Sequence, residues 1–134
     1  MIERELMRGA GPIAVLKLLE RREMYGYEIA EALSQRTDGV LAMGQSTLYP
    51  LLYNLEAKGL LASRWDDSGS RGRKYYALTT SGKRRLSEDA KQWQAAVDAM
   101  RALGVVASTR GVTAMVRAIL GHGAGCAPVG ARVA

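Results

Sequence analysis

The chain has 134 residues, which is the length of one domain built around a single hydrophobic core. Hydrophobic residues make up 48% of it and charged residues 24%, so the composition is that of an ordinary globular protein and argues against disorder. The 19 Lys and Arg against 13 Asp and Glu give a formal net charge of +6, which favours an anionic partner such as nucleic acid or a membrane surface.

The sequence also bears on where the protein acts. It has a single cysteine, Cys126, so no internal disulfide can form, which fits a reducing cytoplasm. The first residues include Glu3, Arg4 and Glu5, unlike a signal peptide. No stretch approaches the roughly 18 apolar residues that a membrane span needs. We therefore expect a cytoplasmic protein with no membrane partner.

Two short helices are predicted first. Residues 11–22 open with Gly11 and Pro12, and proline suits a first helical turn. Apolar side chains lie nearly all round this segment, which predicts a buried helix. Residues 26–36 predict a second helix with Ile29, Ala30 and Leu33 on one face, ended by a loop rich in turn residues.

A third helix has the clearest pattern. Its leucines recur three and four residues apart and must face a core: Leu48, Leu51, Leu52 and Leu55. Either Ser46 or Thr47 could cap its start. Since Pro50 is tolerated best near the first turn, Thr47 is the favoured cap. Gly59 is a natural end.

The period then changes from helix to strand. Residues 60–65 alternate and residues 74–78 form a β-rich run with two tyrosines. The segment 66–72 between them has the composition of a hairpin loop. Three helices followed by a two-stranded hairpin form a winged helix-turn-helix. We therefore expect a mainly α fold with a small β-hairpin, in which residues 1–79 form the DNA-binding domain.

A long helix is predicted from an N-cap at Thr79 to Leu103. Its apolar positions are spaced 4, 3, 4 and 3 residues apart, as in a coiled coil: Leu86, Ala90, Trp93, Val97 and Met100. Such a narrow seam suits a partner helix, so residues 80–103 are predicted to be a dimerisation helix and the protein a homodimer. Trp93 either forms a wall of an effector pocket between subunits or simply packs in the core.

Residues 104–134 are a C-terminal extension of different composition, rich in glycine and without acids or aromatics. A short accessory helix is predicted near 108–120, and the end from Gly121 should be mobile. His122 and Cys126 lie four residues apart, but no third ligand accompanies them, so we expect no metal and no cofactor. Cys126 has no neighbouring cation or helix start that would make it a redox switch.

The outward face of the third helix is the first candidate for nucleic-acid binding. The positions opposite and beside the leucine stripe are small polar or aromatic: Ser46, Thr47, Tyr49, Pro50, Tyr53, Asn54 and Ala57. In a major groove, Asn and Ser side chains could meet base edges while Tyr hydroxyls meet phosphates. The alternative is an ordinary polar surface helix.

The hairpin is the second candidate. Six cations and no acid fall within residues 71–85, and the first three lie at the hairpin: Arg71, Arg73, Lys74, Lys83, Arg84 and Arg85. Arginine projected from a glycine-flanked loop can lie along a phosphate backbone or enter a minor groove. The alternative is a solvated run of charge, which is less frequent beside a helix-turn-helix pattern.

The chain also resembles the PadR-type transcriptional regulators over about residues 5 to 103. The resemblance rests on motifs that occur in order: Glu5-Leu6-Met7-Arg8-Gly9, Tyr25-Gly26-Tyr27-Glu28-Ile29, Ser46-Thr47-Leu48-Tyr49-Pro50-Leu51-Leu52, Leu55-Glu56-Ala57-Lys58-Gly59-Leu60, Arg73-Lys74-Tyr75-Tyr76-Ala77-Leu78-Thr79, Gly82 and Trp93. The sequence departs from the family pattern at Gly9-Ala10-Gly11-Pro12, and the tail after residue 104 has no counterpart.

The resemblance implies a homodimeric winged helix protein with a single C-terminal helix. It implies a function as a repressor, and some members release DNA when a small aromatic or cationic compound binds. The DNA contacts carried over by position are Tyr25, Ser46, Thr47, Tyr49, Asn54, Arg73 and Lys74.

Taken together, the sequence predicts a sequence-specific regulator that binds double-stranded DNA. An enzyme is disfavoured, because one His, one Cys and no phosphate-binding loop or paired carboxylates leave little to perform chemistry. The alternative is a winged helix that serves only protein contacts, and the cationic hairpin argues against it.

Overall fold

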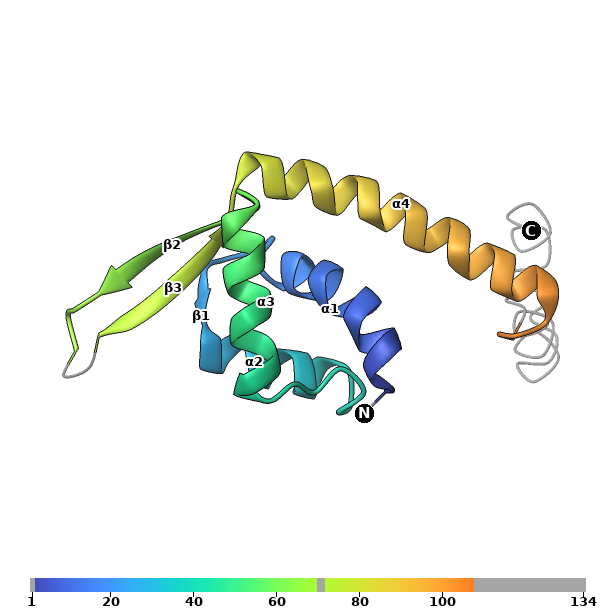
Figure 1. Cartoon of the computed structure of the whole chain (residues 1–134), viewed down its shortest axis with the longest axis horizontal. Coiled ribbons are helices and arrows are strands. Elements are labelled where there is room, and N and C mark those ends of the chain that lie inside the picture. Colours follow the sequence, from blue (N-terminus) through green and yellow to red (C-terminus); the bar gives the residue numbers. More distant parts are fainter. Residues whose placement is uncertain (1, 70–71, 108–134) are drawn as a thin grey trace, which may run out of the picture. The chain divides into compact units, whose positions relative to one another are not determined.

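The computed structural model describes residues 2–69 and 72–107 (Figure 1). The chain forms two compact units, Met1–Lys91 and Gln92–Ala134. The first unit holds three helices, α1 (Arg4–Leu18), α2 (Gly26–Arg36) and α3 (Gln45–Ala57), and a small sheet. A fourth helix, α4 (Thr80–Leu103), begins in the first unit and continues into the second. The prediction of a mainly α fold with a β-hairpin is confirmed.

Both predicted helix starts that relied on a proline were wrong. α1 begins at Arg4 instead of residue 11, with Pro12 inside it, and it ends at Leu18. α3 begins at Gln45 with Gly44 as its N-cap instead of Thr47, and Pro50 lies inside it. A proline deprives the carbonyl four residues earlier of its donor. In each helix that carbonyl belongs to an exposed residue, Arg8 or Ser46, so water can satisfy it.

The end of α1 was predicted at residue 22 and lies earlier, at Leu18. The boundaries of α2, the end of α3 and the boundaries of α4 agree with the sequence. α2 spans the predicted residues, and its N–H group at Tyr25 donates to the Glu28 carboxylate at 3.2 Å. α3 ends at Ala57, and Gly59, the predicted stop two residues further on, has a φ of 77°, in the left-handed region that glycine adopts freely. There Gly59 N donates to Glu56 O at 2.9 Å and Leu60 N to Leu55 O at 3.0 Å, which satisfies two terminal carbonyls.

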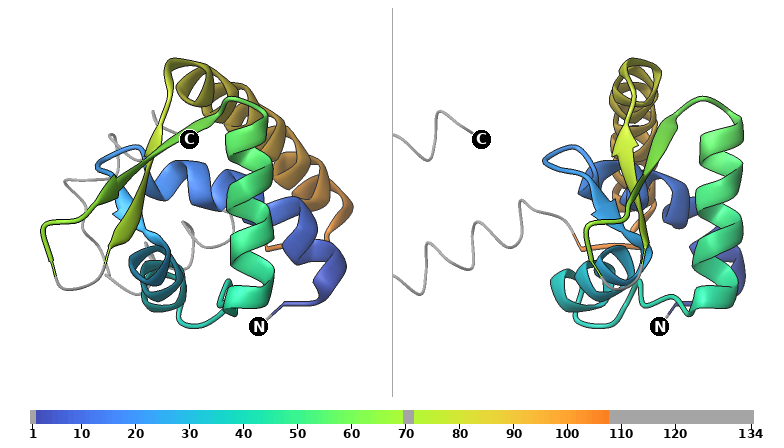
Figure 2. Two further views of the ribbon diagram at one scale, coloured as in Figure 1. Left: turned by 60° about the vertical axis from the view of Figure 1, so that its left-hand side comes forward. Right: turned by 90° about the vertical axis from the view of Figure 1, so that its left-hand side faces the viewer.

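The sheet has three antiparallel strands in the order β1-β3-β2. The predicted hairpin is present as β2 (Leu61–Asp66) and β3 (Arg73–Leu78). A two-residue strand, β1 (Met24–Tyr25), pairs with the other edge of β3 and was not predicted. The outer end of the hairpin projects away from the helices, while β2 packs beside α3, as Figure 1 and the two further views in Figure 2 show. The first unit is therefore a winged helix domain.

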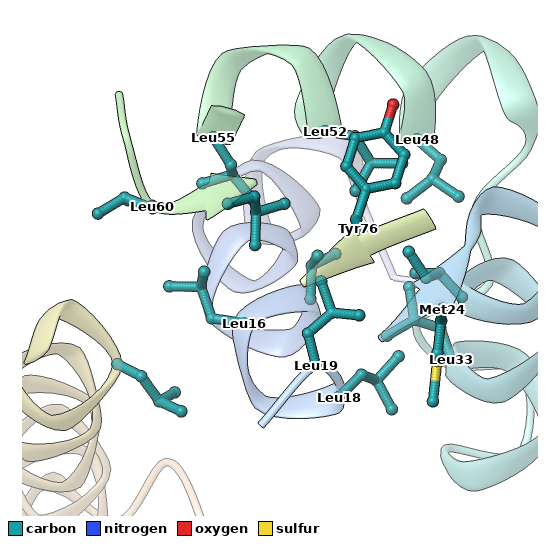
Figure 3. Packing of buried hydrophobic residues seen from close by; sticks show 14 residues of the cluster. Leu16, Leu18, Leu19, Met24, Leu33, Leu48, Leu52, Leu55, Leu60 and Tyr76 are labelled. Atoms are coloured by element: carbon teal, nitrogen blue, oxygen red, sulfur yellow. The ribbon is translucent and has the colours of Figure 1, made fainter. Parts of the chain in front are cut away.

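The core lies between the three helices and the sheet (Figure 3). It includes three residues of the predicted leucine stripe, Leu48, Leu52 and Leu55, and the fully buried ring of Tyr76 from β3. Burying apolar side chains of this size stabilises the fold by roughly 1.5–3 kcal/mol each. The face of α3 opposite these leucines is thereby fixed outward.

The start of α4 is fastened to this core. Thr79 is the N-cap, as predicted: its Oγ1 accepts from Gly82 N at 2.9 Å and donates to Gly59 O at 2.7 Å. Gly82 is buried against the backbone of Leu60, and a Cβ at position 82 would lie 2.2 Å from Leu60 O. Leu86, predicted for the dimer seam, is 5% exposed and belongs to the core of the protomer itself.

Several predictions fall outside the described residues. These are the accessory helix near 108–120, the mobile end from Gly121, and the pair His122 and Cys126. Within residues 2–69 and 72–107, no helix is long and apolar enough to cross a membrane.

Candidate nucleic-acid interface

The outward face of α3 carries the predicted polar residues. Ser46, Thr47 and Asn54 are exposed, and the Tyr53 ring is 55% exposed. Tyr49 is half-buried and lies across the start of α2, where a Cβ at Gly26 would come within 2.6 Å of the Tyr49 Oη. The lack of a side chain at Gly26 therefore leaves room for this ring, and the Tyr49 hydroxyl lies at the start of α2.

On one face of the sheet, side chains of β1 and β3 contact one another. The Arg73 guanidinium lies 4.7 Å from the centre of the Tyr25 ring, a cation–π contact. The Tyr25 ring in turn meets the edge of Tyr75, with ring centres 5.5 Å apart and planes at 69°. These contacts hold the exposed Arg73 guanidinium and the half-buried Tyr25 ring side by side. The structure thus brings together two residues that are far apart in the sequence and were both predicted to contact DNA.

The other face of the hairpin packs towards α3. The Lys74 Nζ lies 3.5 Å from a Glu56 carboxylate oxygen and 5.3 Å from the centre of the Tyr53 ring. Ser63 Oγ donates to the same carboxylate at 2.5 Å. Desolvation lowers the pKa of Lys74, but Tyr76 and the Glu56 carboxylate outweigh it, so this pKa lies above its ordinary value. Lys74 is therefore held charged where α3 and the hairpin meet.

Arg73 and Lys74 consequently lie on opposite faces of the hairpin, because successive side chains of a strand alternate. A sequence run of cations does not reveal this division. Arg71, the third predicted cation of the hairpin, lies outside the described residues.

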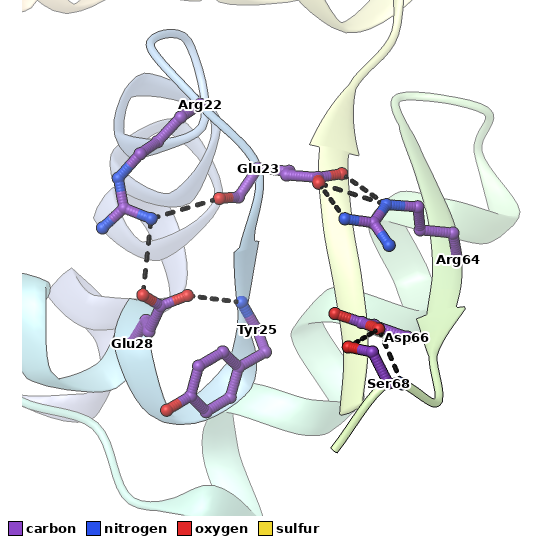
Figure 4. A network of polar contacts seen from close by, with 7 residues as sticks. All are labelled: Arg22, Glu23, Tyr25, Glu28, Arg64, Asp66 and Ser68. Atoms are coloured by element: carbon purple, nitrogen blue, oxygen red, sulfur yellow. Dashed lines mark hydrogen bonds and ion pairs between the residues drawn. The ribbon is translucent and has the colours of Figure 1, made fainter. Parts of the chain in front are cut away.

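Sequence reasoning missed an ion pair that joins the hairpin to the segment before α2 (Figure 4). Arg64 on β2 donates to both carboxylate oxygens of Glu23, and its Nε lies 3.0 Å from Glu23 Oε2. The Arg64 hydrogen bond lowers the pKa of Glu23. Arg64 also lies 4.9 Å from the centre of the Tyr75 ring. Opposite charges 41 residues apart gave no sequence signal that they would meet.

Two residues near the outer end of the hairpin were also missed. Trp65 is 64% exposed, and its indole lies beside Gly72, whose lack of a side chain leaves room for it. Asp66 accepts from both the N–H and the hydroxyl of Ser68, at 3.0 and 2.6 Å (Figure 4). These hydrogen bonds lower the pKa of Asp66 and fix the beginning of the loop.

The predicted seam of α4 divides in two. Leu86 is buried in the protomer core, whereas Ala90, Trp93 and Met100 are exposed and Val97 is half-buried. Trp93 and Met100 are 40% and 45% exposed. The apolar surface that this face of α4 offers to a partner therefore comes from the positions after Leu86.

Comparison with known proteins identifies relatives that share most of the winged helix domain. The model of the transcriptional regulator PadR-like family matches residues 15–88, more than half of the chain. The transcriptional regulator Rv3488 of Mycobacterium tuberculosis is 35% identical over 86 residues, covering 64% of this chain and 78% of that protein. The transcriptional regulator YqjI of Escherichia coli is 29% identical over 107 residues, 80% of this chain but only 50% of that longer protein.

A solved structure agrees. The crystal structure of a PadR family transcriptional regulator from Eggerthella lenta superimposes with a TM-score of 0.67 and 41% identity, covering 74% of this chain and 85% of that chain. The region that the family model matches, residues 15–88, includes α2, α3 and the hairpin, the elements that carry the exposed residues described above.

Proposed function

The chain belongs to the PadR-like family of transcriptional regulators, and we propose that it is a homodimeric repressor that binds a specific sequence of double-stranded DNA. The observation that carries the proposal is the contact between α3 and the hairpin. Lys74 lies against Tyr53, so the polar face of α3 and a charged strand border one another. A duplex that received α3 in its major groove would meet the hairpin at its backbone.

In this proposal α3 reads the bases. Asn54 has the donor and acceptor needed to pair with an adenine edge, and Ser46 and Thr47 can meet either kind of base. All three are exposed, because the leucine stripe fixes the opposite face inward. Tyr49 and Tyr53 would donate their hydroxyls to phosphates and set the register of the helix on the duplex.

The hairpin and β1 supply backbone contacts. Arg73 and Tyr25 would bind one phosphate together, since their side chains are already in contact. Lys74 would bind another on the α3 side, and Arg71 is proposed from the sequence alone. Each phosphate neutralised by a cation releases counterions, which makes affinity fall with salt.

Dimerisation would follow from the seam of α4. Trp93, Val97 and Met100 leave apolar surface uncovered in one protomer, and a second copy of the helix would bury it. A two-fold dimer carries two copies of α3 and therefore reads an inverted repeat. Repression follows simply from a dimer that occupies promoter DNA. Relief by a small aromatic or cationic compound at Trp93 is part of the same proposal.

The experiment measures fluorescence anisotropy of a labelled duplex across a salt series. For wild type we expect log K to fall linearly with log salt, with a slope of about −0.9 for each phosphate contact. Arg73→Ala combined with Lys74→Ala should reduce the slope by about 1.8. Arg36→Ala, on the far end of α2, is the control and should leave it unchanged. An unchanged slope in the double variant would favour the alternative of a protein-interaction module.

A further inference from the structure

A groove of about 890 Å³ runs between α1, the segment before α3, and α3 itself. All of its lining belongs to the winged helix unit. Residues 2–12, from α1 and the segment before it, line the groove together with residues 42–58, from α3 and its flanking segments. This volume is within the roughly 300–1,000 Å³ of small-molecule sites in proteins.

The charge around the groove has one sign. Arg4 and Arg8 lie one turn apart on α1, and Lys58 lies at the end of α3. No acid lines the groove, and none of the three cations forms an ion pair with any other described residue. Among the other described cations, Arg64 and Arg85 form ion pairs with carboxylates, whereas Arg21 and Arg36 form none with a described residue. The three cations of the groove are left with their charge available to a ligand.

Part of the lining of the groove is apolar. Met7, Pro12, Met43 and Leu51 line it, and the two methionines offer flexible, polarisable side chains. Gly11 lets the two sides approach, since a Cβ there would lie 3.2 Å from Met43 Cε and 3.3 Å from Leu51 Cδ2. A lining that combines apolar side chains with cations and no acid fits a molecule with an apolar body and one negative group.

We propose that this groove is a binding site for an amphipathic organic anion, in which the negative group meets Arg4 and Arg8, one turn apart on α1, and the apolar body lies on Met7, Met43 and Leu51. The site is distinct from Trp93 on α4. Ser46, Thr47 and Asn54 line the groove and also form the face of α3 that would read DNA. A bound anion and the duplex therefore exclude one another, and this competition rests on the proposed function.

Binding is tested first without DNA, using octanoate as the probe and methionine methyl NMR as the readout on the full chain. Octanoate should shift the methyl signals of Met7 and Met43 and leave those of Met24 and Met100 in place. Octylammonium, of equal length and opposite charge, should give no shift. Shifts of equal size at all four methionines, or for both probes, would overturn the proposal, because they would indicate unselective adsorption.

Matched variants then test the cations. Arg4→Gln with Arg8→Gln should weaken octanoate binding at least tenfold, as expected for the loss of hydrogen bonds to a charged group. Arg21→Gln with Arg36→Gln removes the same charge away from the groove and should leave the affinity unchanged. Equal losses in both variants would contradict a site at the groove.

Competition is measured with the labelled duplex at constant ionic strength. Octanoate should raise the apparent Kd in proportion to its concentration without reaching a plateau. A plateau, or no change while Met7 and Met43 still shift, would overturn the exclusion of DNA. A chain that binds no duplex would defeat the proposed function, whereas the methyl shifts would still decide whether the anion site exists. If octanoate shifts neither methionine but Arg4→Gln with Arg8→Gln lowers the salt slope, the groove holds phosphate backbone instead.

Discussion

The Lys74 ammonium group lies 3.5 Å from the Glu56 carboxylate, so the cation of the hairpin that lies nearest to α3 is already paired within the protomer. In the proposed complex a DNA phosphate competes with Glu56 for Lys74. Glu56→Gln should therefore raise duplex affinity, by about two- to fivefold for a partly exposed ion pair. Lys74→Gln should lower affinity and reduce the salt slope by about 0.9.

The control for this pair is Glu31→Gln on the exposed face of α2, which removes one negative charge at a distance. Anisotropy with the labelled duplex provides the measurement for all three variants. If Glu56→Gln weakens binding as much as Lys74→Gln does, Glu56 positions Lys74 for the duplex and does not compete with it.

The contact between Arg73 and Tyr25 predicts different effects for the phenol ring and its hydroxyl. Tyr25→Phe keeps the ring beneath the guanidinium and beside Tyr75, and removes only the hydroxyl. We expect a three- to tenfold loss of duplex affinity with no change in melting temperature, as for roughly one hydrogen bond. Tyr25→Leu should lose more, since Arg73 is then unsupported. Wild-type affinity in Tyr25→Phe would remove the hydroxyl from the interface.

Gly82 predicts a stability effect that involves no ligand. A Cβ at this position would lie 2.2 Å from Leu60 O and 2.7 Å from Leu78 Cδ1, so α4 would have to move away from the sheet. Gly82→Ala should lower the free energy of unfolding by about 2–3 kcal/mol, measured in urea. Ser81→Ala, at the exposed neighbouring position, is the control. Equal stability of the two variants would show that α4 does not begin against Leu60.

The seam of α4 predicts the oligomeric state. Val97→Glu places a charge among Trp93 and Met100 and should convert a dimer into a monomer in sedimentation velocity at micromolar concentration. Ala95→Glu adds the same charge on the opposite face of the helix and should stay dimeric. A monomeric wild type at that concentration would contradict the assignment of α4 as the dimerisation helix.

Much of the fold could be read from local patterns. The leucine stripe of α3, the end of that helix just before Gly59 and the cap at Thr79 depend on residues close in sequence, and the structure confirms them. The starts of α1 and α3 could not be read in the same way. Proline inside a helix removes one hydrogen-bond donor and crowds the carbonyl four residues earlier. Arg8 and Ser46 are exposed, a tertiary property, so water can satisfy their carbonyls.

The sequence predicts which residues form the candidate site better than it predicts how their side chains are arranged. The polar face of α3 and the cations of the hairpin follow from spacing. The two-residue strand β1 is too short to leave a period, yet it supplies Tyr25 to Arg73. The pairings of Glu23 with Arg64 and of Glu56 with Lys74 depend on how strands and helices meet in space.

The central claim is that α3 reads a DNA sequence twice, once in each half of a dimer. Selection of bound duplexes from a random pool by the purified full chain, followed by sequencing, tests it most directly. The proposal predicts enrichment of an inverted repeat with half-site centres about one helical turn apart. It also predicts that Asn54→Ala loses about 1–3 kcal/mol on that sequence and little on random DNA. A selection that enriches no sequence would contradict the account.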